Sequence, residues 1–338
     1  MNNLKWSFTN IWNESLEQRE QRELKPRNRI WASELGGAYI DRFLKMKGEP
    51  QTNPPNARSL RKFEAGNMME WIIEMVLKRA GILQESQKWI QYQYDGLLPV
   101  TGKLDFYAGG LPDWNEAIKK IEALDLPEFF KRATHQIIEH LKSYNKELEK
   151  IIIEVKSCSS FMYDRYEKYG LESSKNHVMQ TFHYLKADNM PEAHLTYICK
   201  DDLRMLEFGI FNPSRYEDWY KEDIEKMTVY YNSDIQPPLE QEVIYNEDTC
   251  KFSTNWKVTY SQYLTRLYGY KEPMEYEEKY QKKIAPWNRV MGRCIRQDKM
   301  TELNLMVIKD IKRLFPNFDS LILEAKKRGI KEEEHEMG

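Results

Sequence analysis

The chain has 338 residues, of which 41% are hydrophobic and 13% aromatic, and its formal net charge is -2. This composition excludes a generally disordered chain and allows one large domain or a domain with a helical appendage. The near-neutral charge excludes a global basic field around the molecule, although a local basic groove for nucleic acid stays compatible with it.

The chain begins without the apolar core of a signal peptide, and its apolar runs are far shorter than the roughly 20 residues of a membrane-spanning helix. We therefore expect a cytoplasmic protein with no membrane partner. The cysteines are spread along the chain without a Cys-x-x-Cys pair, which predicts buried free thiols. They are Cys158, Cys199, Cys250 and Cys294.

Residues 1–55 predict an N-terminal helical arm. Residues 1–30 are polar and rich in Glu, Gln and Arg. From Trp31 to Met46 an apolar spacing predicts a short helix with Ser33 as its N-cap. A loop rich in proline then leads to the next element.

A longer helix is predicted from Asn56 to Ala80, ended by Gly81. Glu70 and Glu74 are four residues apart and share a face, where like charges repel by about a few tenths of a kcal/mol. A cation would relieve this repulsion; the alternative is an acidic stripe facing solvent. A second face of this helix is expected to be apolar, and it comprises Phe63, Met68, Trp71, Ile72, Met75 and Val76.

Two alternating stretches, Trp89–Tyr94 and Leu97–Tyr107, predict a hairpin that turns at Asp95-Gly96. Asp is disfavoured inside a strand, so the position of Asp105 between two apolar neighbours needs an explanation. Either the residue has a function there, or it lies at a turn or at the edge of a sheet. Residues 111–149 then predict an inserted pair of helices, Trp114 to Ala123 and Pro127 to Glu149.

A buried strand is predicted at Ile151–Ser157, because three consecutive β-branched apolar residues open it. Side chains alternate across a strand, so Glu154 and Lys156 emerge on one face and Val155 on the other. An acid and a cation thus meet at the end of a buried strand. A solvated strand end is the alternative.

A helix from Lys175 to Ala187 follows, with Gln180 and Tyr184 four residues apart on one face. Strands are predicted at His194–Cys199 and Met205–Phe211. Beyond Pro213 the pattern is mainly helical. The segments are 214–232, 238–248, a Tyr/Trp-rich stretch 256–270, and 300–328 as an amphipathic packing helix, followed by a charged tail at 331–336.

Taken in order, these polar positions resemble the motifs of the PD-(D/E)XK nuclease superfamily, and within it the RecB-like branch of phage recombination and CRISPR-adaptation nucleases. The resemblance covers about residues 31–210. Its pieces are Ser33-Glu34-Leu35-Gly36, Phe63-x-x-Gly66-x-x-x-Glu70-x-x-x-Glu74, Gly102-x-x-Asp105, Glu154-Val155-Lys156 and Gln180-x-x-x-Tyr184.

The resemblance implies an α/β fold with a restriction-endonuclease-like core, in which a mixed central sheet is flanked by helices. It places this core at 56–212, with the helical insertion 111–149, between the arm 1–55 and a mainly helical C-terminal region 213–338. An iron-sulfur cluster, found in the CRISPR-associated branch, is not expected because its first cysteine would lie near Ala38.

The resemblance also implies roles for individual residues. Asp105 and Glu154 would bind Mg²⁺ or Mn²⁺, with the backbone carbonyl of Val155 as a further ligand. Glu70 would join them, although many RecB-like exonucleases carry His at this motif. Lys156 would position or deprotonate the attacking water. Gln180 and Tyr184 would hold the phosphate or orient the lysine.

Elementary chemistry is consistent with these roles. Carboxylate oxygens suit hard divalent cations, and carboxylates gathered in a cleft repel each other unless a cation binds. We expect burial and a bound cation to lower the pKa of Lys156. DNA contacts are expected from Arg58, Arg61, Lys62, Lys103, Lys175 and His177, and base stacking from Tyr163, Tyr166 and Tyr169. Ordinary surface charge and packing aromatics are the alternative.

The sequence therefore predicts a metal-dependent deoxyribonuclease, favoured as an exonuclease in phage or mobile-element recombination or replication. It would act in the host cytoplasm if phage-encoded, with an annealing protein or a helicase as a candidate partner. An endonuclease of the same fold and a non-catalytic DNA-binding or scaffold protein are the alternatives.

Overall fold

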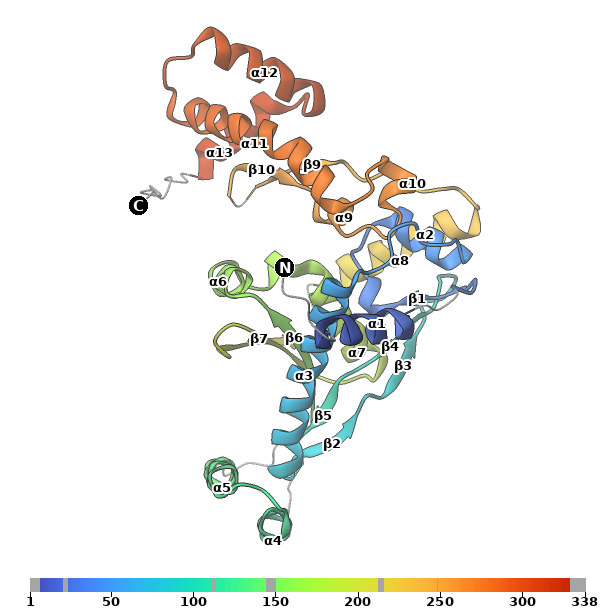
Figure 1. Cartoon of the computed structure of the whole chain (residues 1–338), viewed down its shortest axis with the longest axis vertical. Helices are drawn as coiled ribbons and strands as arrows, with labels where there is room; N and C mark the ends of the chain where they lie inside the picture. Colours follow the sequence, from blue (N-terminus) through green and yellow to red (C-terminus); the bar gives the residue numbers. More distant parts are fainter. Residues whose placement is uncertain are drawn as a thin grey trace. The chain divides into compact units, whose positions relative to one another are not determined.

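The computed structural model describes residues 7–20, 24–110, 113–143, 150–211, 216–247 and 249–328 (Figure 1). The chain divides into two compact units. The first unit comprises residues 1–50 and 55–237, and the second comprises 51–54 and 238–338. Helix α8 (Glu217–Asn232) thus lies in the first unit, whereas the sequence analysis assigned it to the C-terminal region.

A mixed five-stranded sheet forms the centre of the first unit, with the strand order β2-β5-β6-β7-β8. Strands β6 and β7 are parallel, and the other pairs are antiparallel. The α/β class with a mixed sheet flanked by helices is confirmed. The strands are β2 (Leu83–Ser86), β5 (Phe106–Ala108), β6 (Ile151–Cys158), β7 (Glu192–Cys199) and β8 (Met205–Phe211).

Two long helices flank this sheet: α3 (Ala57–Arg79) and α7 (Lys175–Ala187). Val155 of β6 lies in one apolar cluster with Leu77 of α3. Lys156 pairs in register with Tyr197 of β7, whose hydroxyl is hydrogen-bonded to His177 of α7. Because consecutive side chains point to opposite faces, α3 and α7 cover opposite faces of β6.

The ends of α3 are as predicted, but its buried face is not. The Asn56 side chain accepts a hydrogen bond from Ser59 N at the N-cap, and Gly81 follows the helix with a φ of 74°. The residues that pack toward the sheet are Leu77, Met69 and Ile73. Four residues of the expected apolar face are instead exposed: Phe63, Met68, Trp71 and Ile72.

The predicted hairpin is present, but its second strand is divided between two sheets. Strands β3 (Trp89–Tyr92) and β4 (Val100–Lys103) pair antiparallel, and β1 (Ile30–Trp31) pairs parallel with β4. The chain then leaves this three-stranded sheet and enters the central sheet as β5. Asp105 therefore lies at a break between two strands.

The N-terminal arm differs from its prediction in one respect. Helix α1 (Phe8–Glu20) contacts α3. The expected helix 31–46 is replaced by β1, a 3₁₀ turn η1 (Ala32–Glu34) and α2 (Tyr39–Lys47). Ser33 lies inside η1 and caps no helix. The N-cap of α2 is Ala38, which provides no side-chain hydrogen bond.

The inserted helices are confirmed as α4 (Trp114–Ala123) and α5 (Glu128–Lys142), while residues 144–149 lie outside the described part. They enclose a small core of Ala117, Ile121 and Ile138. Between β6 and α7 the chain forms α6 (Ser160–Tyr169) and the 3₁₀ helix η2 (Gly170–Ser174), which the sequence analysis did not assign.

The second unit has its own core, which includes Phe252, Trp287, Phe315 and Phe318. The expected helix 238–248 is wrong, because these residues lead into a β-hairpin. The segment 300–328 forms two helices, and a further helix of 24 residues, α11, was not predicted. The elements are β9 (Val243–Asn246), β10 (Lys251–Thr254), α9 (Trp256–Thr259), α10 (Leu264–Tyr268), α11 (Pro273–Arg296), α12 (Glu302–Leu314) and α13 (Phe318–Arg328).

The predicted thiols are free, with Cys158, Cys199 and Cys250 buried and Cys294 partly buried. Within the described ranges, none of the helices combines the length and apolar character that crossing a membrane requires. The charged tail 331–336 lies outside these ranges.

A buried ion pair joins α2 to α8 within the first unit. The Arg42 guanidinium donates to both carboxylate oxygens of Asp223, at 2.7 and 2.9 Å. Arg42 also lies over the ring of Tyr39, 4.6 Å from its centre. Both charged groups are removed from water, so each depends on the other for its solvation.

We expect Arg42→Met to destabilise the first unit by about 3–5 kcal/mol, because it leaves Asp223 buried without a counter-charge. The double replacement Arg42→Met/Asp223→Leu removes both charges and should recover most of that loss. Urea unfolding followed by circular dichroism measures both values. A single variant that loses less than about 1 kcal/mol, the level of an exposed pair, would contradict the interpretation.

Candidate active site

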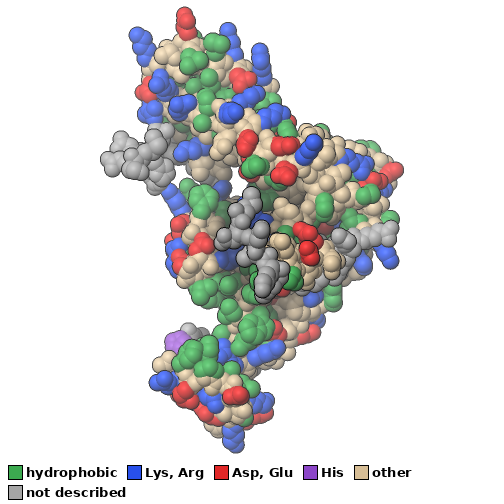
Figure 2. All heavy atoms as spheres, in the orientation of Figure 1, with side chains coloured by type: hydrophobic (Ala, Val, Ile, Leu, Met, Phe, Trp, Pro, Cys, Tyr) green, Lys and Arg blue, Asp and Glu red, His purple; other side chains and the backbone are tan. Residues whose placement is uncertain are grey.

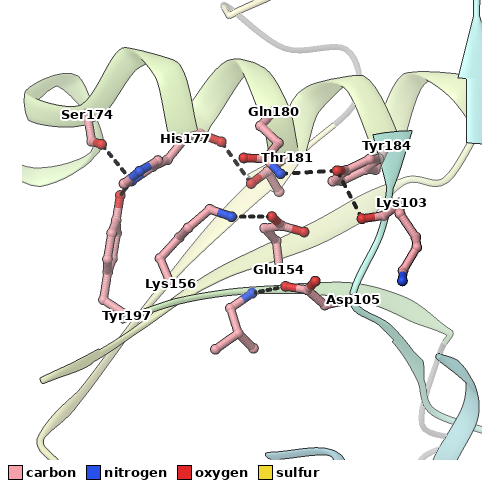
Figure 3. A network of polar contacts seen from close by, with 11 residues as sticks. Lys103, Asp105, Glu154, Lys156, Ser174, His177, Gln180, Thr181, Tyr184 and Tyr197 are labelled. Carbon is pink, nitrogen blue, oxygen red and sulfur yellow. Dashed lines mark hydrogen bonds and ion pairs between the residues drawn. The ribbon is translucent and has the colours of Figure 1, made fainter. Parts of the chain in front are cut away.

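Asp105 occupies the break between β4 and β5. Its side chain is 7% exposed, and its Oδ2 accepts a hydrogen bond of 2.8 Å from Val155 N. This N–H is available because the ladder between β5 and β6 ends at the pair Phe106 and Ile153. The Asp105 carboxylate thus takes the place of the next ladder partner and lies beside the polar end of β6 (Figure 3).

Glu154 and Lys156 form an ion pair on the α7 side of β6. Lys156 Nζ lies 2.5 Å from Glu154 Oε1, and the Glu154 side chain is 1% exposed. The other carboxylate oxygen, Oε2, is buried, receives no hydrogen bond from a donor among the described residues, and belongs to a group that also interacts with the Asp105 carboxyl. A buried acceptor without a donor is costly, so this atom points to a donor or cation that the described part of the chain does not supply.

The three carboxyl groups of the site influence each other. Burial, and then the charge of Asp105, raise the pKa of Glu70 on α3 to about 7, against the opposing effect of Lys156 and Lys103. Burial also raises the pKa of Glu154 and of Asp105, and Lys156 opposes both shifts. Glu70, Asp105 and Glu154 therefore belong to one electrostatic cluster, although they come from different elements.

In this structure the neighbouring carboxylates raise the pKa of Lys156, whereas the expected lowering concerns a lysine beside a bound cation and stays a prediction. Burial lowers it, but the Glu154 and Asp105 charges raise it more, so the net direction is upward. Without a bound cation the carboxylates decide the sign, and the amine keeps its proton.

Helix α7 supports the site from above through Tyr184 (Figure 3). The Tyr184 hydroxyl donates to the backbone oxygen of Lys103 at 3.1 Å and accepts from Gln180 Nε2 at 3.1 Å. Close approach is possible because residue 102 is glycine: a Cβ there would lie 2.7 Å from the Tyr184 ring and 2.6 Å from Ala32 Cβ. The motif Gly102-x-x-Asp105 thus has a packing reason as well as a chemical one.

His177 faces the interior of the unit. Its Nδ1 is hydrogen-bonded to Ser174 Oγ at 2.8 Å and to Tyr197 Oη at 3.0 Å. Burial, with a contribution from Lys156, lowers its pKa to about 3. The imidazole is therefore neutral at physiological pH and does not supply the phosphate-binding charge expected of it. Sequence reasoning missed Ser174 and Tyr197, and strand alternation gave a signal only for Tyr197, because Ser174 lies in η2.

The other cations that were expected to bind DNA differ in their exposure and in their contacts with other side chains. Arg58, Lys62 and Lys103 are exposed. Arg61 is hydrogen-bonded to Asn13 of α1, and Lys175 lies over Trp219, 4.4 Å from the ring centre. Only Lys103 among them influences the carboxylate cluster.

The expected base-stacking tyrosines need correction. Tyr163 and Tyr166 are 4% and 5% exposed. Tyr163 donates its hydroxyl proton to the Met205 carbonyl, and Tyr166 stacks on Tyr197 with ring centres 4.0 Å apart. These two rings pack the core between α6 and the sheet, and Tyr169 alone is partly accessible.

The carboxylates are not gathered into a complete ligand set. Glu74 accepts from Ser86 Oγ at 2.9 Å and pairs with Lys78 at 2.8 Å, so it does not join Glu70. Across the described part of the chain, no three His, Cys, Asp or Glu side chains are arranged to hold a metal ion. The chemistry of the donors still fits a hard cation, because Asp105 and Oε2 of Glu154 offer carboxylate oxygens.

Known structures resemble this chain only distantly. No family model and no curated protein sequence matches it. The protein SSO0001 shares 16% identity over 73% of this chain and 95% of its own, with a TM-score of 0.41. An alkaline exonuclease (LHK-Exo) from Laribacter hongkongensis shares 11% identity over 65% and 94%, with a TM-score of 0.36. A phage-related exonuclease from Haemophilus somnus 129PT shares 12% over 62% and 96%, with a TM-score of 0.31. At these values the likeness assigns no activity to this chain.

We expect Gly102→Ala to cost about 1–3 kcal/mol of stability, because the added methyl group overlaps the Tyr184 ring. Adding Ala32→Gly should recover part of the loss. Gly66→Ala is the matched control, since a Cβ there meets only Ser157 Oγ at 3.4 Å and α3 gains helix propensity. Equal effects of both substitutions on urea unfolding would contradict the packing role of Gly102.

Proposed function

We propose that the first unit hydrolyses phosphodiester bonds in DNA with the help of Mg²⁺ or Mn²⁺. The observation that supports this most directly is the buried Glu154 carboxylate, which is paired with Lys156 on one oxygen and receives no hydrogen bond from any described residue on the other. A purely structural ion pair gains stability when its remaining lone pairs are satisfied. An oxygen left open beside a second buried carboxylate, Asp105, instead suits a ligand that arrives with positive charge.

Asp105 and Glu154 would hold the cation with the Val155 carbonyl as a further ligand, and Glu70 would have to approach them to join the set. Their oxygen chemistry and their raised pKa values both favour a positively charged partner. When bound, a divalent cation supplies the charge that stabilises a phosphate under attack and activates water.

The other residues would act on the nucleophile and the phosphate. Lys156, which is paired with Glu154, would position or deprotonate the attacking water. Gln180 donates to the Tyr184 hydroxyl, which donates to the Lys103 carbonyl, so these hydrogen bonds fix α7 against the backbone next to Asp105. Exposed Lys103, beside the carboxylates, would contact the DNA backbone.

The choice of an exonuclease, and of DNA as substrate, rests on the ordered motifs from Glu70 to Tyr184 and their resemblance to RecB-like nucleases. An endonuclease would use the same groups. Closed circular DNA separates the two, because an exonuclease needs an end and leaves the circle intact.

We expect the purified protein to degrade linear DNA with Mg²⁺ or Mn²⁺ and to be inactive with a chelator. Lys156→Ala should lower the rate by at least about 100-fold, as loss of a group acting on the nucleophile does. Lys119→Ala removes an exposed lysine from α4 and serves as the control. Gel and fluorescence assays on linear double-stranded, linear single-stranded and circular DNA give the result. Full activity of the Lys156 variant would exclude it from the mechanism.

We also expect Mn²⁺ to stabilise the protein directly. A ligand that binds only the folded state adds about 2.7 kcal/mol at 100 times its dissociation constant. Thermal unfolding with Mn²⁺ and with chelator measures this, and Asp105→Asn should lose the gain. A metal-induced increase in Tm that Asp105→Asn retains would place the cation elsewhere.

A further inference from the structure

Helix α11 of the second unit has an unusual charge pattern. From Lys279 to Arg296 it carries six Lys or Arg residues and no Asp or Glu. Extended to Arg313, the segment has ten Lys or Arg and three Asp or Glu, a net charge of +7, although the whole chain has -2. The near-neutral total therefore conceals a strongly basic part, which the sequence analysis did not separate from the rest.

The cations of α11 lie on one side of the helix. Successive residues of a helix turn by 100°, so spacings of three, four and seven keep side chains on one face. The cationic face, as we define it, has these spacings and comprises Lys279, Lys282, Arg289, Arg293 and Arg296, with Lys283 at its border. Of these, Arg293 is partly buried and donates to Asn304 of α12 at 3.2 Å. The face runs for about 26 Å at 1.5 Å per residue.

The opposite side of α11 belongs to the core of the second unit. Tyr276, Tyr280, Trp287, Val290 and Met291 are all buried. Trp287 also donates its indole N–H to Asp310 of α12 at 3.1 Å. The helix is therefore fixed by its apolar side, and the direction of its cationic face within the unit is fixed with it.

The middle of the cationic face has no acidic partner. Lys279 lies 4.0 Å from Glu242, and Arg296 pairs with Asp298 at 3.0 Å, near the two ends of the face. Lys282, Lys283 and Arg289 are exposed, and none of them has an ion pair with any residue in the described part of the chain. Figure 2 shows Lys and Arg side chains gathered over α11, α12 and α13.

From this geometry we infer that the α11 cationic face binds the phosphate backbone of a nucleic acid. Cations repeated along about 26 Å match a partner whose charge is also repeated along its length, and duplex DNA carries one negative charge per about 1.7 Å. Backbone contacts of this kind position a nucleic acid without reading its sequence. The preference for nucleic acid over another polyanion rests on the proposed function of the first unit.

A membrane surface fits this face less well. A helix that lies on a bilayer inserts an exposed apolar face next to its basic one. The apolar side of α11 is buried against its own unit, with Trp287 at 2% and Met291 at 0% exposure. From Lys279 to Arg296 the exposed positions are Lys, Arg or Gln, apart from Ala285, which favours a hydrophilic polyanion on this face.

The test is binding of the full-length chain to fluorescent single-stranded and duplex DNA, measured by anisotropy in chelator so that no cleavage occurs. The variant is Lys282→Gln/Lys283→Gln/Arg289→Gln. The matched control, Lys25→Gln/Lys119→Gln/Arg132→Gln, removes the same charge from exposed positions of the first unit that likewise have no ion pair with a described residue. Circular dichroism checks that all three proteins are folded.

We expect the α11 variant to bind DNA at least about tenfold more weakly than the control. On duplex DNA each phosphate contact adds about 0.9 to the magnitude of the slope of log affinity against log salt. Loss of three contacts should therefore reduce that magnitude by about 2–3. Equal affinity of variant and control would overturn the inference. So would a wild-type protein that binds anionic vesicles but no DNA.

The outcome is separate from that of the proposed function. A protein that binds DNA through α11 but cleaves none would keep this inference and remove the nuclease. Cleavage abolished by Lys156→Ala, with DNA binding unaffected by the α11 variant, would keep the nuclease and remove this inference.

Discussion

The first unit depends on keeping like charges together away from water. Asp105 and Glu154 are 7% and 1% exposed, and Lys156 compensates them only in part, because one Glu154 oxygen receives no hydrogen bond from the residues that the structure describes. Burial of such groups is costly unless the surrounding structure fixes their geometry. Most local features around β6 serve this purpose: the Val155 N–H that bonds to Asp105, the Tyr184 hydroxyl that α7 holds against Lys103, and the glycine that admits its ring.

The same constraint explains the break between β4 and β5. A continuous strand would have placed a backbone carbonyl, not a carboxylate, opposite the Val155 N–H. By leaving one sheet and entering another, the chain brings the Asp105 side chain to that position. Before the break, Gly102 in β4 leaves room for the Tyr184 ring. Sequence reasoning marked Asp105 as out of place in a strand, which was the right signal. Strand propensity alone does not show that the residues before Asp105 join one sheet and the residues after it join another.

Where one periodic pattern dominated, the sequence was sufficient to predict the type of an element and its approximate ends. The β6 strand, α4 and α7 were predicted with correct type and nearly correct ends, and Glu154 and Lys156 do share a face. Prediction failed where the pattern was ambiguous. Helix α3 has apolar residues around most of its circumference, so its buried side is set by the sheet, through Met69, Ile73 and Leu77. The short run Val243–Asn246 fits a strand or a helix equally well, and its pairing with β10 decides.

The two units use charge in opposite ways, and a whole-chain total cannot show this. In the first unit, acidic groups are concentrated in the interior, where low dielectric makes each interaction strong and raises the pKa of the Glu70, Asp105 and Glu154 carboxyls. In the second unit, cations are concentrated on the outer side of one helix, where water screens them and only a polyanion gathers many at once. A buried acidic cluster selects a compact cation, whereas an extended cationic face selects an extended anion. Both units are close to neutral in total, so each of these charge clusters becomes visible only when the fold shows where its side chains lie.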